Sequence, residues 1–463
     1  MALSANTVFE VRTTGSDSSG GGFVTGAAGT DRSQQAAAHA TLSAASVVHT
    51  TTTQINVAAG DYTVTDPGDV GNLLQITGGT ATAGFYQITV ADVANNRWTV
   101  DRAAGAAGAT VVGAMGGALV SAGKAAGAMT VSGQITWVDD GAYNISSTTA
   151  NASGGRVSLG AANTRMLGYN VTRGDSTGTR PVLTATVNTM TLVTVGEDVV
   201  CGNIELSAGA ATGIAGTNAA SQAFLHDMKM TGANATAAFR GQTNSTHFRC
   251  EATGGTVQGF LGEGGHFLAC KASAIAGRGF GTSGTSTTVF ANCLSFDNTG
   301  GTGKGFDHAT ATGSAIFLNC TAYGNAADNF DNSAGPVASC NWFNCLAVSS
   351  ALEGFSRNGR AWHCAAFNNT GGNYDATVIQ INSITLTVDP FVNAAGGNFG
   401  LNSTAGGGAD CKGAGTPGVY PGLANTIGYL DIGAVQAQAS ASAATTVNSI
   451  HALLALPRSW DIE

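Results

Sequence analysis

The chain has 463 residues, a formal net charge of −9, and 10% charged residues, against roughly 25% in ordinary soluble proteins. It has no lysine- and arginine-rich block and no run of 18 apolar residues, which disfavours nucleic-acid binding and predicts no membrane-spanning helix. Sixty-seven glycines combined with 43% hydrophobic residues predict a tightly turned β protein rather than disorder, because disorder requires low hydrophobicity and high charge together.

Residues 1–50 are interpreted as an N-terminal arm, with one expected strand at Val8–Arg12 followed by a Gly/Ser-rich stretch at 15–22. The first residues have neither the basic nor the apolar segment of a signal peptide, so we expect synthesis and assembly in the cytoplasm.

Residues 51–115 predict a small, separate β-barrel or sandwich. Five short strands are expected at 53–57, 61–65, 73–77, 85–90 and 97–101, separated by turn formers such as Pro67-Gly68 and Asn95-Asn96. We expect this unit to cap the open end of the repeat that follows, to dock the protein onto a partner, or both.

From 116 to about 435 the chain becomes a repeat, which is most regular between Phe239 and Asp375. A cysteine and an aromatic residue recur in each repeat. The recurring aromatic residue lies ten residues after the recurring cysteine, except once, where the distance is 13. The cysteines are Cys250, Cys270, Cys293, Cys320, Cys345 and Cys364, and the aromatic residues are Phe239, Phe260, Phe280, Phe306, Phe330, Phe355 and Tyr374. A fixed internal spacing in repeats of variable length indicates one rigid segment and one variable loop per repeat.

The rigid segment, for example Val289–Asn298, alternates apolar with small or polar residues and ends on a turn-forming Asn, as expected of a half-buried strand. Helical spacing and a leucine framework are missing, and a propeller blade needs roughly 40 residues. The sequence therefore predicts an all-β fold, a right-handed parallel β-helix of about 13 coils. Cysteine and phenylalanine would form two stacked columns inside it.

The cysteines are explained by this column as buried thiols rather than disulfides, because stacked residues point their side chains in parallel. The pairs His247/Cys250 and His363/Cys364 lack the four-ligand spacing of a structural zinc site. No nucleotide-binding motif is present. We therefore expect neither a metal nor a cofactor.

The segments that follow the repeat are rich in Gly and Pro. The chain then ends in a tail, 436–463, that is Ala/Ser-rich and later apolar. Such a tail can pack on its own body or on a neighbour.

Several stretches together resemble right-handed parallel β-helix repeat proteins of the pectate-lyase-like superfamily. They are the two columns, Gly168–Asp175, and the ending Asp389-Pro390-Phe391-Val392, Asn398-Phe399-Gly400-Leu401 and Asp431-Ile432-Gly433-Ala434. The beginning, Val8–Gly15 followed by Gly20–Val24, is similar to versions encoded by bacteriophages and prophages. This resemblance covers residues 8–435 and implies a virion protein, assembled as a homotrimer and attached to other virion proteins through its N-terminal region.

Candidate catalytic residues follow the aromatic column. Asp307 and Asp331 come directly after Phe306 and Phe330 on consecutive coils, with His308 beside them, so the two carboxylates are expected within roughly 5 Å. Such a pair suits the acid/base chemistry of polysaccharide cleavage. The competing interpretation, which we favour, makes these aspartates and Asp375 turn residues that cap the bend after each aromatic, because no other charged residues cluster there in the sequence.

The sequence thus favours a non-enzymatic structural virion protein, either a head decoration or spike or a tail spike or fibre, with possible binding to host surface glycans. The first alternative is a polysaccharide depolymerase or lyase that uses Asp307, Asp331 and His308 on host glycans. The second is a cell-surface adhesin, disfavoured by the missing signal peptide. Arg173-Gly174-Asp175 matches a cell-adhesion tripeptide, but a turn between coils explains it better.

Overall fold

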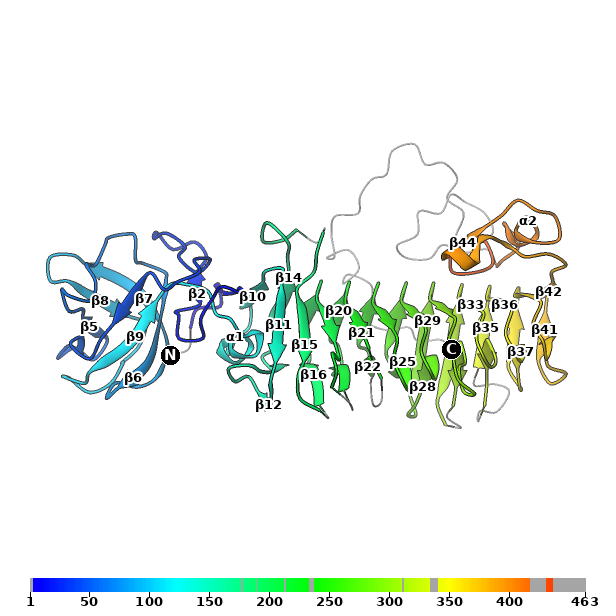
Figure 1. Cartoon of the computed structure of the whole chain (residues 1–463), viewed down its shortest axis with the longest axis horizontal. Helices are drawn as coiled ribbons and strands as arrows, with labels where there is room; N and C mark the ends of the chain where they lie inside the picture. Colours follow the sequence, from blue (N-terminus) through cyan, green and yellow to red (C-terminus); the bar gives the residue numbers. More distant parts are fainter. Residues whose placement is uncertain are drawn as a thin grey trace, which may run out of the picture.

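The computed structural model describes residues 3–175, 178–188, 190–211, 214–232, 237–309, 312–333, 340–416 and 430–435; the tail expected at 436–463 lies outside this part of the chain. Its strands stack into a straight rod with a separate β unit at one end (Figure 1). Along the rod, each strand pairs in parallel with strands of the preceding and following coils. The predicted right-handed parallel β-helix, preceded by a small β unit, is confirmed.

Each coil contributes one strand to each of three sheets. Sheet 1 contains β2 (Gly22–Val24), β1 (Thr7–Val11), β10 (Ile135–Val138), β14 (Arg165–Gly168), β17 (Val200–Gly202), β20 (Phe224–His226), β23 (Thr246–Phe248), β26 (His266–Leu268), β29 (Thr287–Ala291), β32 (Ser314–Leu318), β35 (Cys340–Phe343), β38 (Arg360–Trp362) and β41 (Ile379–Ile381). Sheet 2 contains β11 (Ala142–Ile145), β15 (Val182–Ala185), β18 (Glu205–Ser207), β21 (Lys229–Thr231), β24 (Glu251–Thr253), β27 (Lys271–Ser273), β30 (Leu294–Phe296), β33 (Thr321–Tyr323), β36 (Leu346–Val348), β39 (Ala365–Phe367) and β42 (Ile384–Thr385). Sheet 3 contains β12 (Ser147–Ala150), β13 (Gly155–Leu159), β16 (Met190–Val195), β19 (Ile214–Ala219), β22 (Phe239–Gln242), β25 (Gln258–Glu263), β28 (Arg278–Thr282), β31 (Phe306–His308), β34 (Phe330–Asp331), β37 (Glu353–Ser356) and β40 (Gly372–Tyr374).

Sheets 2 and 3 have 11 strands each, fewer than the 13 coils expected, because the described residues after Thr385 form other elements and the first regular coil begins at β10. The preceding residues form helix α1 (Ala122–Ala128), a short Ala/Gly helix that buries Ala122, Ala125 and Ala126. It packs against β1, β10 and β13 and so covers the first end of the core.

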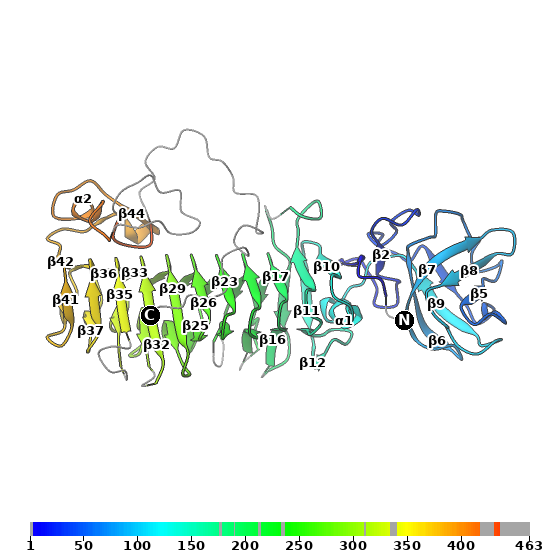
Figure 2. The same cartoon turned by 180° about the vertical axis from the view of Figure 1, so that it is seen from behind.

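Residues 1–50 do not form a free arm. Strand β1 is buried along its whole length and pairs in parallel with β10, so the first strand of sheet 1 comes from the N-terminus. Strands β3 (Ala40–Leu42) and β4 (Val47–Val48) belong to a seven-stranded antiparallel sheet with β5 (Gln54–Asn56), β6 (Leu73–Gly79), β7 (Gly84–Asp92), β8 (Arg97–Val100) and β9 (Val111–Met115). The β unit is therefore built between β1 and β10, at the end of the rod (Figure 2). No strand forms at the expected 61–65.

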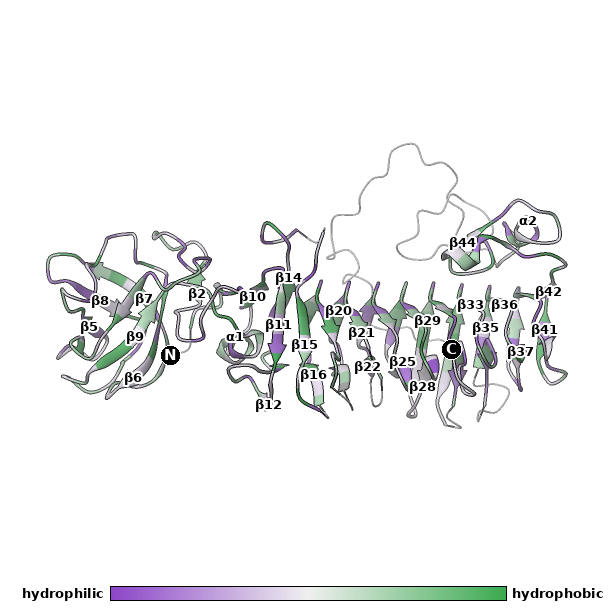
Figure 3. Ribbon diagram, viewed as in Figure 1, coloured by the Kyte–Doolittle hydropathy of each residue, from purple (hydrophilic) through white to green (hydrophobic). Residues whose placement is uncertain are grey.

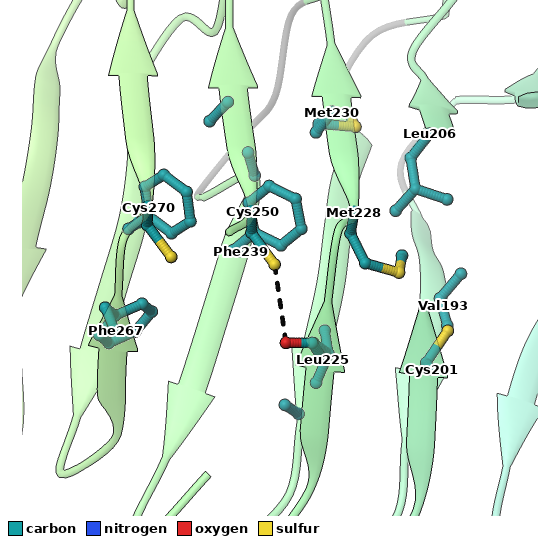
Figure 4. Packing of buried hydrophobic residues seen from close by; sticks show 14 of the residues in the cluster. Val193, Cys201, Leu206, Leu225, Met228, Met230, Phe239, Cys250, Phe267 and Cys270 are labelled. Carbon is teal, nitrogen blue, oxygen red and sulfur yellow. Dashed lines mark hydrogen bonds between the residues drawn. The ribbon is translucent and has the colours of Figure 1, made fainter. Parts of the chain in front are cut away.

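The interior contains stacked columns, as predicted. Rings of Phe239, Phe260, Phe280, Phe306, Phe330 and Phe355 stack with centroids 4.7–5.0 Å apart. All nine cysteines are free and buried. Each thiol of the cysteine column contacts a backbone carbonyl of the preceding coil, as Cys250 does with Leu225 at 3.8 Å (Figure 4). Met228 holds the cysteine position on the coil before Cys250, because Lys229 and Glu251 are register partners.

A second aromatic column, which was not predicted, lies three residues before five of the six cysteines of the cysteine column. His247, Phe267, Phe290 and Phe317 stack with centroids 4.7–5.1 Å apart, and Trp342 continues the column on the next strand. The two aromatic columns contact each other edge to face, for example Phe280 with Phe290 at 5.6 Å. This arrangement fills the core with aromatic contacts in both directions.

The segment expected as one strand is two strands that meet at a corner. Asn292 stands between β29 and β30 with a φ of 54°, and the same corner is occupied by Ala269 and His363 on other coils. The second corner has its left-handed residue at Asp297, one position before the expected Asn298. Asn298 is instead buried and donates a hydrogen bond to Asn325 on the next coil, at 2.8 Å.

The C-terminal segment returns along the rod and covers part of sheet 2. It contains β43 (Phe391–Asn393), a 3-10 turn η2 (Ala394–Gly396), β44 (Asn398–Leu401) and the short helix α2 (Gly408–Cys411). Phe391, Phe399 and Ile432 pack on the outward Leu346 and Val348. No helix among the described residues is long and apolar enough to span a membrane.

His247 is the one imidazole in the second aromatic column, and both of its ring nitrogens are buried without a hydrogen-bond partner. Burial lowers its pKa to about 3. We expect His247→Phe to stabilise the protein by about 1–3 kcal/mol, since it removes an unsatisfied buried donor and continues the column. The gain should grow below pH 6.5, where the unfolded chain binds a proton that the folded chain excludes.

Denaturant unfolding at pH 5 and pH 8 measures this effect. The reciprocal change Phe290→His, in the same column two coils after His247, should lower the free energy of unfolding. Equal or lower stability of His247→Phe at both pH values would show that the ring has partners we have not identified.

Candidate functional site

Asp307 and Asp331 lie on the outer side of sheet 3, next to Phe306 and Phe330, whose rings stack inside. They are register partners on the neighbouring strands β31 and β34, one strand spacing of about 4.8 Å apart. The sequence analysis thus placed them together correctly. Both residues, however, have 0% exposure.

Lys304 lies between the two carboxylates. Its Nζ is 3.3 Å from Asp307 Oδ1 and 2.5 Å from Asp331 Oδ2, and its side chain is itself mostly buried. Arg278 Nε approaches Asp307 Oδ2 to 2.7 Å, and Ser333 donates a hydrogen bond to Asp307 Oδ1 at 2.8 Å. Each carboxylate is therefore held by a cation.

Asp331 has fewer strong partners than Asp307. Arg357 Nε is 3.8 Å from its Oδ1, so Lys304 supplies its one close charge contact among the described residues. Burial raises the pKa of Asp331, and the charge of Asp307 adds to this effect, while Lys304 opposes it.

A second acidic pair, Asp328 and Glu353, continues the site on the next coils. The Glu353 backbone N–H donates to Asp328 Oδ1 at 3.1 Å. Burial, a hydrogen bond with the Glu353 side chain and the charge of Asp331 raise the pKa of Asp328 to about 7.

His308 does not join the carboxylates. It follows Asp307 in the strand and so points to the opposite side of the sheet, where its Nδ1 lies 2.7 Å from Thr282 Oγ1. Burial lowers its pKa. The predicted grouping of His308 with the two aspartates is therefore wrong in geometry.

The turn-capping interpretation applies only to Asp375, which accepts a backbone hydrogen bond from Thr377 at 2.7 Å. Asp307 and Asp331 are strand residues in an ion-pair network. The expectation that no other charges cluster there was wrong, because Lys304 of the Asp307 coil and Arg278 and Arg357 of neighbouring coils approach the two aspartates.

The missed residues had a signal in the sequence. The position two residues before each aromatic is Gln258, Arg278, Lys304, Asp328 and Glu353 on five consecutive coils, a column that changes from cationic to anionic. This column places Lys304 between Arg278 and Asp328 in the repeat.

A shallow hollow of about 300 Å³ adjoins this network, lined by Thr256, Val257, Gln258, Gly277, Arg278 and Thr302. It is large enough for a small polar group, and Arg278 is its charged wall. The carboxylates lie behind Arg278 and Lys304 and have no exposed surface. In this arrangement neither aspartate can exchange a proton with a molecule in the hollow.

The adhesion-like tripeptide Arg173-Gly174-Asp175 is tied to the N-terminal residues. Arg173 Nε is 2.8 Å from Glu10 Oε2, and Arg173 Nη1 is 2.8 Å from Asp31 Oδ2. Asp175 accepts hydrogen bonds from the backbone of Asn170, Val171 and Thr172. The charged groups of Arg173 and Asp175 thus both bind other groups of the same chain.

Comparison with known proteins gives similarity of fold only. No protein-family model and no curated protein matches the sequence. Among solved structures, pectate lyase Pel9A is 15% identical over 69% of this chain and 92% of that chain, with a TM-score of 0.47. A rhamnogalacturonan lyase is 16% identical over 57% and 84%, with a TM-score of 0.41. ORF18 of Geobacillus virus E2 is 14% identical over 54% and 52%, with a TM-score of 0.35.

The parallel β-helix is established by the strand pairing of this structure itself. None of these similarities is strong enough to carry an argument about chemistry.

Replacement of Lys304 tests the ion network. Lys304→Met leaves two buried carboxylates one strand apart without their shared cation, so we expect a loss of about 3–5 kcal/mol in unfolding free energy. The matched control is Arg240→Met, which breaks a pair with Glu263 in which Arg240 is 44% exposed; a loss below about 1 kcal/mol is expected. Denaturant unfolding followed by intrinsic tryptophan fluorescence measures both losses, and equal losses would contradict the network's role.

Asp328 provides a pH test. Its folded-state pKa lies above the unfolded value, so the folded chain keeps a proton that the unfolded chain releases between about pH 4 and pH 7. Stability from this group is present at low pH and lost as pH rises through 7. We expect the advantage of wild type over Asp328→Asn in melting temperature to fall between pH 4.5 and pH 8. A pH-independent difference would show that Asp328 titrates normally.

Proposed function

We propose that this protein is a non-enzymatic structural component of a bacteriophage particle, a spike, fibre or head decoration that projects its β-helix from the surface. The N-terminal β unit would attach it to other virion proteins after assembly in the host cytoplasm. The observation that carries the non-enzymatic part is the state of Asp307 and Asp331, which are fully buried and ion-paired. General acid/base catalysis needs a group within hydrogen-bond reach of its substrate.

The construction of the rod supports a mechanical role. The core is an unbroken series of stacked aromatic rings and free thiols from Phe239 to Cys364, and both kinds of column hold one coil on the next. The β unit and α1 cover one end of this core, which is the end expected to attach. The bacteriophage assignment rests on the resemblance of the N-terminal sequence.

The second candidate is a depolymerase or lyase for host glycans. Two observations favour it: the carboxylates are spaced as a glycosidase pair, and the hollow with Arg278 lies beside them. It requires Lys304 and Arg278 to move away when a glycan binds. An adhesin that uses Arg173 and Asp175 is disfavoured by the internal contacts of both side chains.

Incubation of the full-length protein with purified host capsule or lipopolysaccharide separates these functions. We expect no release of reducing ends or unsaturated uronates over the blank, and the same result for Asp307→Asn and Asp331→Asn. Release by wild type that falls at least tenfold in both variants, with their folding intact, would establish the enzyme instead.

A further inference from the structure

The outer faces of the β-helix differ in chemistry. Sheet 3 presents ion pairs such as Arg240–Glu263, and Figure 3 shows hydrophilic residues on β25 and β28. Sheet 2 becomes apolar further along the rod, and there the chain's own C-terminal segment covers it through Phe391, Phe399 and Ile432. An apolar outer surface of this rod is thus covered where the C-terminal segment passes over it.

Sheet 1 also has an apolar section on its outer side. One outward column is apolar on seven consecutive strands, where each residue is the register partner of the next. None of its members belongs to a hydrophobic cluster of the described residues. The members, which we call the sheet 1 stripe, are Phe248, Leu268, Ala291, Leu318, Phe343, Trp362 and Ile381.

The dimensions of the stripe fit a single segment of chain. The column becomes polar before Phe248, because the register partner of Phe248 is His226, which lies 3.0 Å from Asp227. Seven strands extend over about 30 Å, and the adjoining outward residues Val289 and Ile316 widen the apolar surface to about 10 Å. An area of about 300 Å² is well below the roughly 800 Å² that each partner contributes to a standard interface between folded proteins.

The centre of the stripe is its most apolar part. The rings of Phe343 and Trp362 stack 5.9 Å apart, and Leu318 follows the outward Ile316 on the same strand. At the first end, by contrast, the Arg249 guanidinium lies 4.6 Å from the centre of the Phe248 ring. Such a surface suits aliphatic side chains and offers no complement to a nucleic acid or another anionic polymer.

The last described residues of the chain lie beside this centre. The Gly433 N–H donates a hydrogen bond to the Asn344 carbonyl at 2.8 Å, and the Ala434 N–H donates to Thr321 Oγ1 at 2.8 Å. Asn344 directly follows Phe343, at the corner between sheets 1 and 2. The chain therefore reaches the edge of sheet 1 within one coil of the middle of the stripe.

Two further contacts hold the C-terminal segment on the same corner. The Thr416 N–H donates to Asn344 Oδ1 at 2.8 Å. His363, which directly follows Trp362, has its Nδ1 3.3 Å from the Ala414 carbonyl oxygen. The segment is thus fixed along the edge of sheet 1 on two consecutive coils before the tail begins.

The sequence of the tail consists of a polar linker and one apolar run. Residues 436–449 are Gln, Ala, Ser, Thr, Asn and one Val, without a charged residue. The run Ile450–Leu456 follows and ends at Pro457. Seven residues extend over at most about 25 Å, which is close to the length of the stripe.

The length of the linker favours the stripe of the same chain. Residues 436–449 reach at most about 50 Å, so every strand of the stripe is within reach of the corner at Asn344. A linker this short gives the apolar run an effective concentration on the order of millimolar at the stripe. A second copy in dilute solution is present at a far lower concentration.

We propose that Ile450–Leu456 lies along the sheet 1 stripe of its own chain, as a strap that continues the cover of sheet 2 around the corner onto sheet 1. Burial of Leu453 and Leu454 against Leu318 and Phe343 removes apolar surface of both partners from water. The strap joins coils that otherwise contact only their neighbours, and it closes the stripe to a second copy. This inference does not rest on the proposed function, so either can fail alone.

Variants in the tail of the full-length protein test the strap while leaving the rod unchanged. We expect Leu453→Glu combined with Leu454→Glu to uncover the stripe, so that the fluorescence of bound anilinonaphthalene sulfonate rises at least about threefold over wild type. The matched control, Ala443→Glu combined with Ala444→Glu, adds the same charges to the linker and should bind the dye as wild type does. Adding Leu318→Glu to the first variant should lower the fluorescence again, because it places a charge at the centre of the uncovered surface.

A cross-link identifies the occupant of the stripe. All nine natural cysteines are buried, so a new pair at the surface can be oxidised selectively. Leu454→Cys combined with Leu318→Cys or with Phe343→Cys should form a disulfide within one chain at micromolar protein. The control combines Leu454→Cys with Thr253→Cys, an outward position of sheet 2 three strands from Tyr323. It is also within reach of the linker and should oxidise at least about tenfold more slowly.

Unchanged dye binding by the Leu453→Glu and Leu454→Glu variant overturns the proposal, as does a rise in dye binding that Leu318→Glu leaves in place. A control pair that oxidises as fast as both stripe pairs overturns it too. A disulfide between two chains, seen as a doubled mass on a non-reducing denaturing gel, assigns the stripe to another copy and likewise overturns the proposal. If the variants in the stripe fail to fold, dye binding by the two tail variants decides alone.

Discussion

Each coil of this protein lies on the previous one in parallel register, at one strand spacing. Because of this constraint, every position of the repeat becomes a column in which like positions contact each other directly. Apolar columns gain from the arrangement: the phenylalanine rings stack at 4.7–5.0 Å, and each cysteine reaches a carbonyl of the coil before it. A charged column would repel itself unless its neighbours alternate in sign or an adjacent column supplies the opposite charge.

The candidate site follows from this constraint. Asp307 and Asp331 are like charges at the same position of neighbouring coils, and Lys304, three residues before Asp307, lies between them. The three-residue excess in this coil precedes Lys304 directly. The two aspartates have the spacing of catalytic carboxylates, but Lys304 and Arg278, at equivalent positions of two coils, stabilise them as ion pairs. The same reasoning explains why perturbed carboxyl pKa values here need not signal catalysis.

The same stacking places equivalent outer positions of neighbouring coils next to each other, so that charged or apolar character often continues over several coils. A face that is charged on one coil tends to be charged on the next, as on sheets 2 and 3, and an apolar position becomes a stripe, as on sheet 1. Part of sheet 2 is covered by the chain's own C-terminal segment.

The sequence alone determined the solenoid, its all-β character, and the cysteine and phenylalanine columns, because the constant ten-residue spacing is a local property of each repeat. It also placed Asp307 beside Asp331. It did not determine the corners, where the left-handed position accepts Ala269 and His363 as well as Asn292, since tertiary packing outweighs residue preference there. Nor did it determine that β1 pairs with β10, or that Lys304 and Arg278 neutralise the two aspartates. Those facts depend on contacts between residues on different coils, or more than 100 residues apart, and only the stacked structure brings them together.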